Sequence, residues 1–98
     1  MGTYLMLWKF NTKLISINPG ERAKGYELLL DIVRKDIECG LVKSWGMFVG
    51  ERSGYCLVEG SEVDVFKMTQ AYTPFVGFST HPVATLDNIA EVIKSLRV

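Results

Sequence analysis

The first segment of the sequence, residues 3–10 (TYLMLWKF), carries large apolar side chains at both its even and its odd positions. It is rich in aromatic residues and too short for a buried helix, so it predicts a β-strand. Successive strand side chains point to opposite faces, which places Tyr4, Met6 and Trp8 on one face and Leu5 and Leu7 on the other. Both faces of the sheet that contains this strand must therefore be covered.

Three further segments predict strands, because apolar and β-branched residues dominate them and turn residues bound them. In the first of these, Lys43, Trp45 and Met47 share one face. A hairpin turn over residues 51–54 is expected to join it to the next strand. Pro82 cannot donate a ladder hydrogen bond, which places the last strand at a sheet edge or Pro82 near its end. The three segments are residues 41–51 (LVKSWGMFVGE), 55–59 (YCLVE) and 76–83 (VGFSTHPV).

Three helices are expected between and after these strands. Asn18-Pro19-Gly20-Glu21 is a strong helix start, and Gly40 is a natural stop. Ser61 can cap a second helix, with an apolar stripe that includes Val65, Phe66 and Tyr72, and Pro74 ends it. A short third helix is expected over residues 85–96, with Ile89, Val92, Ile93 and Leu96 on one side.

The element order β-α-β-β-α-β is the split βαβ pattern of ferredoxin-like folds, here followed by an extra C-terminal helix. It predicts one α+β domain over residues 1–98 with an antiparallel sheet. Right-handed crossovers put both crossover helices on one face of that sheet. A bare apolar second face would exceed the patches that soluble monomers expose, so we expect a second copy to cover it, sheet against sheet. Because Leu5 and Leu7 are smaller, we expect them to lie under the helices and Tyr4, Met6 and Trp8 to face the partner.

Composition narrows the classes of partner. The 98 residues contain 11 basic and 11 acidic side chains, without the basic excess of duplex-binding domains, so we expect no nucleic-acid partner. The apolar stretch near the N-terminus is too short for a membrane span and has no basic region before it. Cys39 and Cys56 have no metal-site spacing, which favours two buried thiols in a reducing cytoplasm.

Several motifs resemble a family of small bacterial and archaeal proteins classed as a domain of unknown function, which belongs to the dimeric α+β barrel superfamily. The resemblance lies in the opening YLMLWKF, the segment GYCLVEGSEVDVF and the ending VGFSTHPV. It covers most of the chain and implies the fold and a homodimeric barrel. The matching positions are Gly54, Tyr55, Leu57, Glu59, Phe78, Pro82 and Val83.

The superfamily resemblance implies several activities and fixes none. Its members include cofactor-free monooxygenases, haem-degrading enzymes and muconolactone isomerase-like proteins, with sites between sheet and helices or inside the barrel. Asn11, Trp45 and His81 supply residue types found in the haem-degrading members. Their placement departs from that pattern, because the haem-ligand histidine lies on a helix there and His81 lies on a predicted strand. We expect no bound cofactor and no metal.

Two residues are weak candidates for catalysis. His81, the only histidine, could be a general base or a ligand, and could equally be a polar residue at a strand end. Glu59 could be a general base in a pocket, or could cap the second helix or pair with a lysine at the sheet edge.

Aromatic residues define the candidate binding site. Trp8, Trp45 and Tyr55 could line an apolar ligand pocket with His81 as its titrating group, although core packing explains the tryptophans about as well. The sequence thus leaves three functions open: binding of a small hydrophobic or aromatic ligand, a cofactor-independent monooxygenase- or isomerase-like enzyme, and a structural oligomerisation module. It does not decide whether the protein is an enzyme.

Overall fold

The computed structural model describes residues 1–97 and contains four strands, three α-helices and one short 3-10 helix. The α+β fold follows the expected ferredoxin-like order, with the third α-helix after the last strand. The elements are β1 (Gly2–Phe10), η1 (Thr12–Leu14), α1 (Pro19–Glu38), β2 (Val42–Met47), β3 (Ser53–Gly60), α2 (Glu62–Tyr72), β4 (Val76–Val83) and α3 (Leu86–Leu96).

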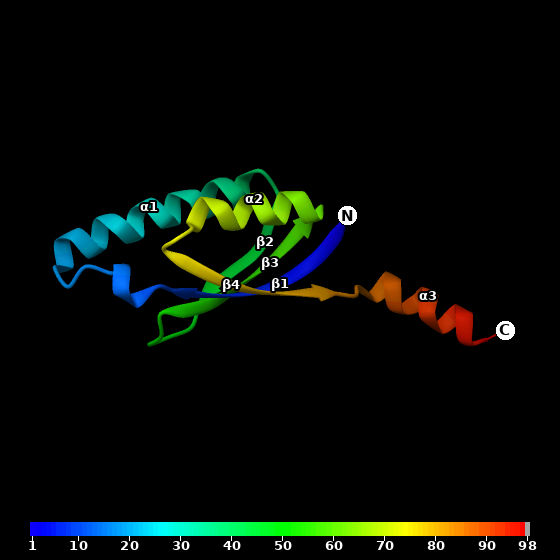
Figure 1. Ribbon diagram of the computed structural model, residues 1–98. Helices are drawn as coiled ribbons and strands as arrows, with labels where there is room; N and C mark the ends of the chain where they lie inside the picture. The colour runs from blue at the N-terminus through cyan, green and yellow to red at the C-terminus, as the bar shows by residue number, and fades with distance from the viewer. Residues whose placement is uncertain (98) are drawn as a thin grey trace.

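The four strands form one antiparallel sheet in the order β2-β3-β1-β4. β4 is an edge strand, which confirms the placement inferred from Pro82. Helices α1 and α2 both lie over one face of the sheet, and no element of residues 1–97 lies over the other (Figure 1). The sheet therefore has a covered face, under α1 and α2, and an open face.

The helices begin where local hydrogen-bond chemistry predicts. The Asn18 side chain accepts from the backbone N–H of Glu21 at 3.1 Å, and Gly40 follows α1 with a left-handed φ of 85°. Ser61 and Asp64 form a reciprocal capping box at the start of α2, at 3.1 and 3.2 Å. Thr85 starts α3 in the same way.

The assignment of the two sheet faces from the sequence is wrong in orientation. Met6 is 0% and Trp8 4% exposed, and both pack under the helices, whereas Leu7 is 41% exposed on the open face. Two helices over a small sheet enclose a deep space, which long side chains fill better than leucine. Two smaller expectations also fail, because Phe66 of α2 is exposed and Cys39 is exposed at the end of α1.

Strand β2 is shorter than expected and contains a β-bulge. Val42 pairs with Val58 and Ser44 with Leu57, so two steps along β2 match one step along β3. The extra residue, Lys43, reverses the alternation. Val42 and Trp45 therefore both lie on the covered face, and Lys43 does not share a face with Trp45 as the plain alternation predicts.

Helix α3 extends away from the rest of the molecule beyond the end of β4 (Figure 1). All of its residues are exposed, including Leu86 at 90% and Leu96 at 78%. The chain is consequently 63 Å long, and its radius of gyration of 16.4 Å exceeds the about 13 Å expected of a compact domain of this length. No helix in residues 1–97 combines the length and apolarity needed to cross a membrane.

Candidate functional site

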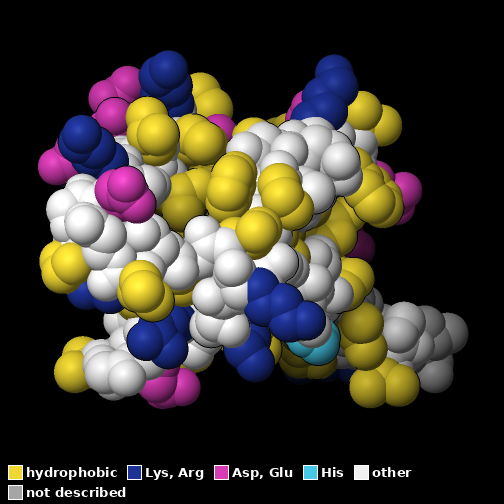
Figure 2. Space-filling model, turned by 60° about the vertical axis from the view of Figure 1, so that its left-hand side comes forward, with side chains coloured by type: hydrophobic (Ala, Val, Ile, Leu, Met, Phe, Trp, Pro, Cys, Tyr) yellow, Lys and Arg dark blue, Asp and Glu magenta, His cyan; other side chains and the backbone are white. Residues whose placement is uncertain are grey.

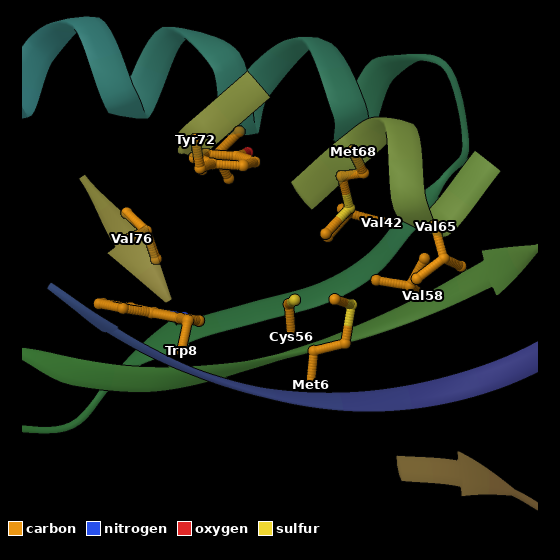
Figure 3. Packing of buried hydrophobic residues seen from close by; sticks show 10 residues of the cluster. Met6, Trp8, Val42, Cys56, Val58, Val65, Met68, Tyr72 and Val76 are labelled. Atoms are coloured by element: carbon orange, nitrogen blue, oxygen red, sulfur yellow. The ribbon is translucent and has the colours of Figure 1, made fainter. Parts of the chain in front are cut away.

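An apolar cavity of about 120 Å³ lies between the covered face of the sheet and the two helices. All four strands and both helices contribute to its wall, and the buried side chains around it point toward one another from the sheet and from the helices (Figure 3). Aromatic and sulfur-containing residues dominate this wall. They include Trp8, Phe10, Tyr26, Trp45, Cys56, Met68, Tyr72 and Phe78.

The two tryptophans form one side of the cavity. Their rings stack with centroids 5.4 Å apart and planes inclined by 10°. The Trp8 ring lies over Gly54, where a Cβ would collide with that ring and with the carbonyl oxygen of Gly46. The Trp8 indole Nε1–H donates to the Tyr55 backbone carbonyl at 3.2 Å. A glycine, a stacked neighbour and a hydrogen bond thus fix the position of Trp8.

A partly buried polar pair joins α1 to α2 beside the cavity. The Tyr72 hydroxyl donates to Asp36 Oδ2 at 3.0 Å, and Tyr72 is 5% exposed. Burial raises the pKa of Asp36 despite this hydrogen bond, and burial and the Asp36 charge raise that of Tyr72. Burial and Asp36 also raise the pKa of Cys56, to about 11, so this thiol is protonated at neutral pH.

The polar groups of the cavity wall are therefore engaged or neutral. The Trp8 N–H and the Tyr72 hydroxyl already have acceptors, and the Cys56 thiol is a poor nucleophile in its protonated form. A ligand here would meet an almost wholly apolar surface. Such a wall selects for shape and hydrophobicity.

A wider groove of about 560 Å³ adjoins the cavity and follows α1 from Glu21 to Lys35. It runs between α1, the segment that follows β1 and the end of α2, and Arg22 and Lys35 lie along it. Phe10 and Tyr26 line both spaces, with stacked rings whose centroids are 5.2 Å apart. This aromatic pair separates the inner cavity from the outer groove.

The structure does not bring together all four residues expected to bind a ligand. Trp8 and Trp45 meet at the cavity, whereas Tyr55 and His81 lie on the open face, paired with Leu7 and Leu5 of β1. His81 is exposed, as Figure 2 shows with the only histidine in cyan, and its Nε2 lies 3.2 Å from the Ser79 hydroxyl. The tyrosine and the histidine thus lie on the other side of the sheet from the cavity.

The remaining candidates have local partners. Glu59 lies 3.5 Å from Lys43 Nζ on the edge strand β2, which is the pairing expected as an alternative to catalysis. The Asn11 side chain accepts from the backbone N–H of Lys13 at 3.2 Å and caps η1. Within residues 1–97 no three histidine, cysteine, aspartate or glutamate side chains are grouped as a metal site would require.

Sequence reasoning missed Asp36 and Tyr72 as a pair. A signal was present: Asp36 lies three residues after Val33, so it places an acid on the apolar stripe of α1. Its partner lies 36 residues further along the chain, and only the packing of α2 against α1 shows which residue that is.

Comparison with known proteins gives one family. A family model described as a domain of unknown function, DUF3303, matches residues 2–97. No curated protein matches the chain.

Proposed function

The chain belongs to the family of the domain of unknown function DUF3303, and we propose that it is a homodimeric α+β barrel that binds a small, uncharged aromatic or hydrophobic molecule between its sheet and its helices. The observation that carries the binding proposal is the apolar cavity beside the stacked Trp8 and Trp45 rings. Engineered apolar cavities of about 150 Å³ bind benzene, so about 120 Å³ fits one aromatic ring. The outer groove, beyond Phe10 and Tyr26, is the proposed entry side.

Binding is favoured over catalysis because no histidine, aspartate, glutamate or lysine of residues 1–97 lines the cavity. Asp36 is engaged by Tyr72 and does not line the cavity, while His81 and Glu59 lie elsewhere. A carboxylate or ammonium group on the ligand would lose its hydration without gaining a partner, which costs several kcal/mol or more. The proposed ligand is therefore neutral.

The experiment uses the two tryptophans as reporters. Nitrobenzene, a neutral one-ring quencher, should quench their fluorescence in a saturable way, and toluene should reverse the quenching by competition. Benzoate is the charged control and should not compete. Quenching that rises linearly with nitrobenzene and does not respond to toluene would show collision without binding, and would overturn the proposal.

A pair of valine variants locates the site. Val76→Phe adds a ring to the cavity wall and should weaken nitrobenzene binding at least about tenfold, because the free volume is filled. Val63→Phe makes the same change at a 60% exposed position of α2 outside the cavity and should leave binding unchanged. Thermal unfolding of both variants verifies that they fold.

The dimer proposal rests on surface area. The chain exposes 7206 Å², whereas a compact monomer of 11.0 kDa exposes about 5,600 Å². If a second copy covered the excess on each chain, the pair would bury about 3,200 Å², within the range of permanent homodimers. The open face supplies Leu5, Leu7, Tyr55 and Leu57 for this contact.

Light scattering at micromolar concentration tests the dimer. Leu57→Asp places a charge in the centre of the open face and should give a monomer. Phe66→Asp makes a comparable change on the outer side of α2, where Phe66 is 71% exposed, and should leave the dimer intact. A wild-type monomer at high concentration would exclude the barrel.

A further inference from the structure

Helix α3 has a continuous apolar stripe and nothing of its own chain to cover it within residues 1–97. Ile89, Val92, Ile93 and Leu96 recur at helical spacing on one side, and their exposed fractions run from 46% to 78%. Glu91 lies on the opposite side of the helix. The capping box of Thr85 and Asn88 fixes the start of the helix, at 2.9 and 3.3 Å.

A second exposed apolar surface lies at the tip of the β2–β3 hairpin. Phe48 is 41% exposed, and Val49, the next residue, is fully exposed at 102%. Gly50, with a φ of 79°, makes the turn. The tip bends below the plane of the sheet, away from α1 and α2 (Figure 1).

The hairpin tip and α3 lie at opposite ends of the sheet. Gly54, the partner of Trp8 on β3, lies near one end, and Val83, the partner of Thr3 on β4, lies at the other. The two surfaces are separated by at least about 15 Å of strand, so they cannot meet within one chain. In a two-fold dimer whose open faces pack together with antiparallel strands, opposite ends coincide. Each α3 and the hairpin tip of the other chain then lie at the same end of the dimer.

We propose that α3 docks its apolar stripe on the β2–β3 hairpin tip of a second copy of this chain. The two-fold dimer then contains this contact twice, once for each α3. This inference rests on the proposed dimer and specifies its orientation. In a two-fold dimer each chain supplies both surfaces of every contact. This chain carries both the hairpin tip and α3. The excess of exposed surface and the radius of gyration of 16.4 Å both come in part from this extended helix.

Disulfide trapping tests the docking in the full-length chain. Cys39→Ser removes the exposed native thiol, and Val49→Cys and Val92→Cys are then introduced together. Mild oxidation should convert most of the protein to a covalent dimer that dithiothreitol separates. Each single cysteine variant should stay uncrosslinked.

The single variants show what would overturn the proposal. A covalent dimer of Val92→Cys alone would mean that the two α3 helices pair with each other, and one of Val49→Cys alone that the hairpins do. No crosslink in the double variant, with light scattering still at the dimer mass, would overturn α3 docking and leave the dimer standing. A monomer in light scattering would overturn both.

A charge substitution gives an independent measurement. Ile89→Asp should raise the dimer dissociation constant by about tenfold or more, because a buried contact acquires an unpaired charge. Glu91→Gln, on the opposite side of α3, should leave the dissociation constant unchanged. Equal constants for the Ile89→Asp variant and the wild-type chain would show that α3 takes no part in assembly.

Discussion

The covered and open faces of the sheet have similar apolar sequences and different surroundings. Met6 on the covered face is 0% exposed, and Leu7, the next residue, is 41% exposed on the open face. The covered face owes its burial to two crossover helices of the same chain, while the open face has no such cover among residues 1–97. Apolar residues at both the even and the odd positions of a strand therefore show that both faces need cover. The helical connections between the strands decide which face the chain covers itself.

The largest expected effect compares neighbouring residues of β1. Met6→Ala should lower the free energy of unfolding by about 2–5 kcal/mol, because it leaves a cavity in the core. Leu5→Ala, on the open face, should act mainly on assembly and raise the dimer dissociation constant. Urea unfolding measures the first and sedimentation the second. Equal losses of unfolding free energy at dilute, monomeric concentrations would contradict the distinction.

Two glycines under aromatic rings sharpen the same comparison. Gly54→Ala on the covered face should cost about 1–3 kcal/mol, since its Cβ meets a backbone carbonyl as well as the fixed Trp8 ring. A Cβ at Gly46, on the open face, would collide with the Tyr55 side chain and with no backbone carbonyl, so Gly46→Ala should cost less. Thermal unfolding ranks the two variants. Near-ultraviolet circular dichroism should change for Gly54→Ala, because Trp8 is displaced.

Removing a helix cap should lower the stability of the whole fold only where the helix packs on the rest of the chain. Asn18→Ala should lower the free energy of unfolding by about 1 kcal/mol, because α1 packs on the sheet. Thr85→Ala should leave global unfolding unchanged in the monomeric Leu57→Asp background, where α3 packs on nothing. A comparable loss for Thr85→Ala in that background would mean that α3 stabilises its own chain.

The smallest expected effect is a pH dependence of stability, which comes from two carboxyl groups whose pKa values are shifted in opposite directions. Burial raises the pKa of Asp36, so its contribution favours folding below the ordinary value near 3.8 and is lost as the pH rises through the raised pKa. Capping hydrogen bonds to Ser61 lower the pKa of Asp64, so its contribution is lost as the pH falls.

Asn substitutions separate these two contributions. Asp36→Asn keeps an acceptor for Tyr72 and should make the variant less stable relative to wild type in acid than at neutral pH. Asp64→Asn should show the opposite trend, with its loss greatest at neutral pH. Urea unfolding from pH 3 to 7 measures both. Parallel curves for Asp36→Asn and the wild-type chain would show that the Asp36 pKa is the same in the folded and unfolded chains.

The sequence predicted the elements of the fold better than their orientation. The starts of α1 and α2 follow from Asn18 and Ser61, because caps depend on hydrogen bonds within one turn. The face of β1 that the helices cover depends on contacts between distant segments, and residue size pointed to the wrong one. Phe66 was misplaced for the same reason, since Met68 takes the buried position on α2.

The candidate site was predictable only in part. Trp8 and Trp45 were singled out for their size and do meet at the cavity. Tyr55 and His81 could not be assigned to the other face without the register, because one step of strand pairing exchanges the faces.

The bulge at Lys43 has a consequence for how this strand can change in evolution. Val42 and Trp45 are three positions apart and still face the same way, because one additional residue lies between them. A homologue that lost a single residue here would regain regular alternation. With Val42 in place, the tryptophan would then lie two positions away and stay on the covered face, so the cavity would keep this wall. A strand that kept all its residues but lost the bulge would turn the tryptophan to the open face, so the bulge is what lets β2 carry one additional residue without removing this ring from the cavity.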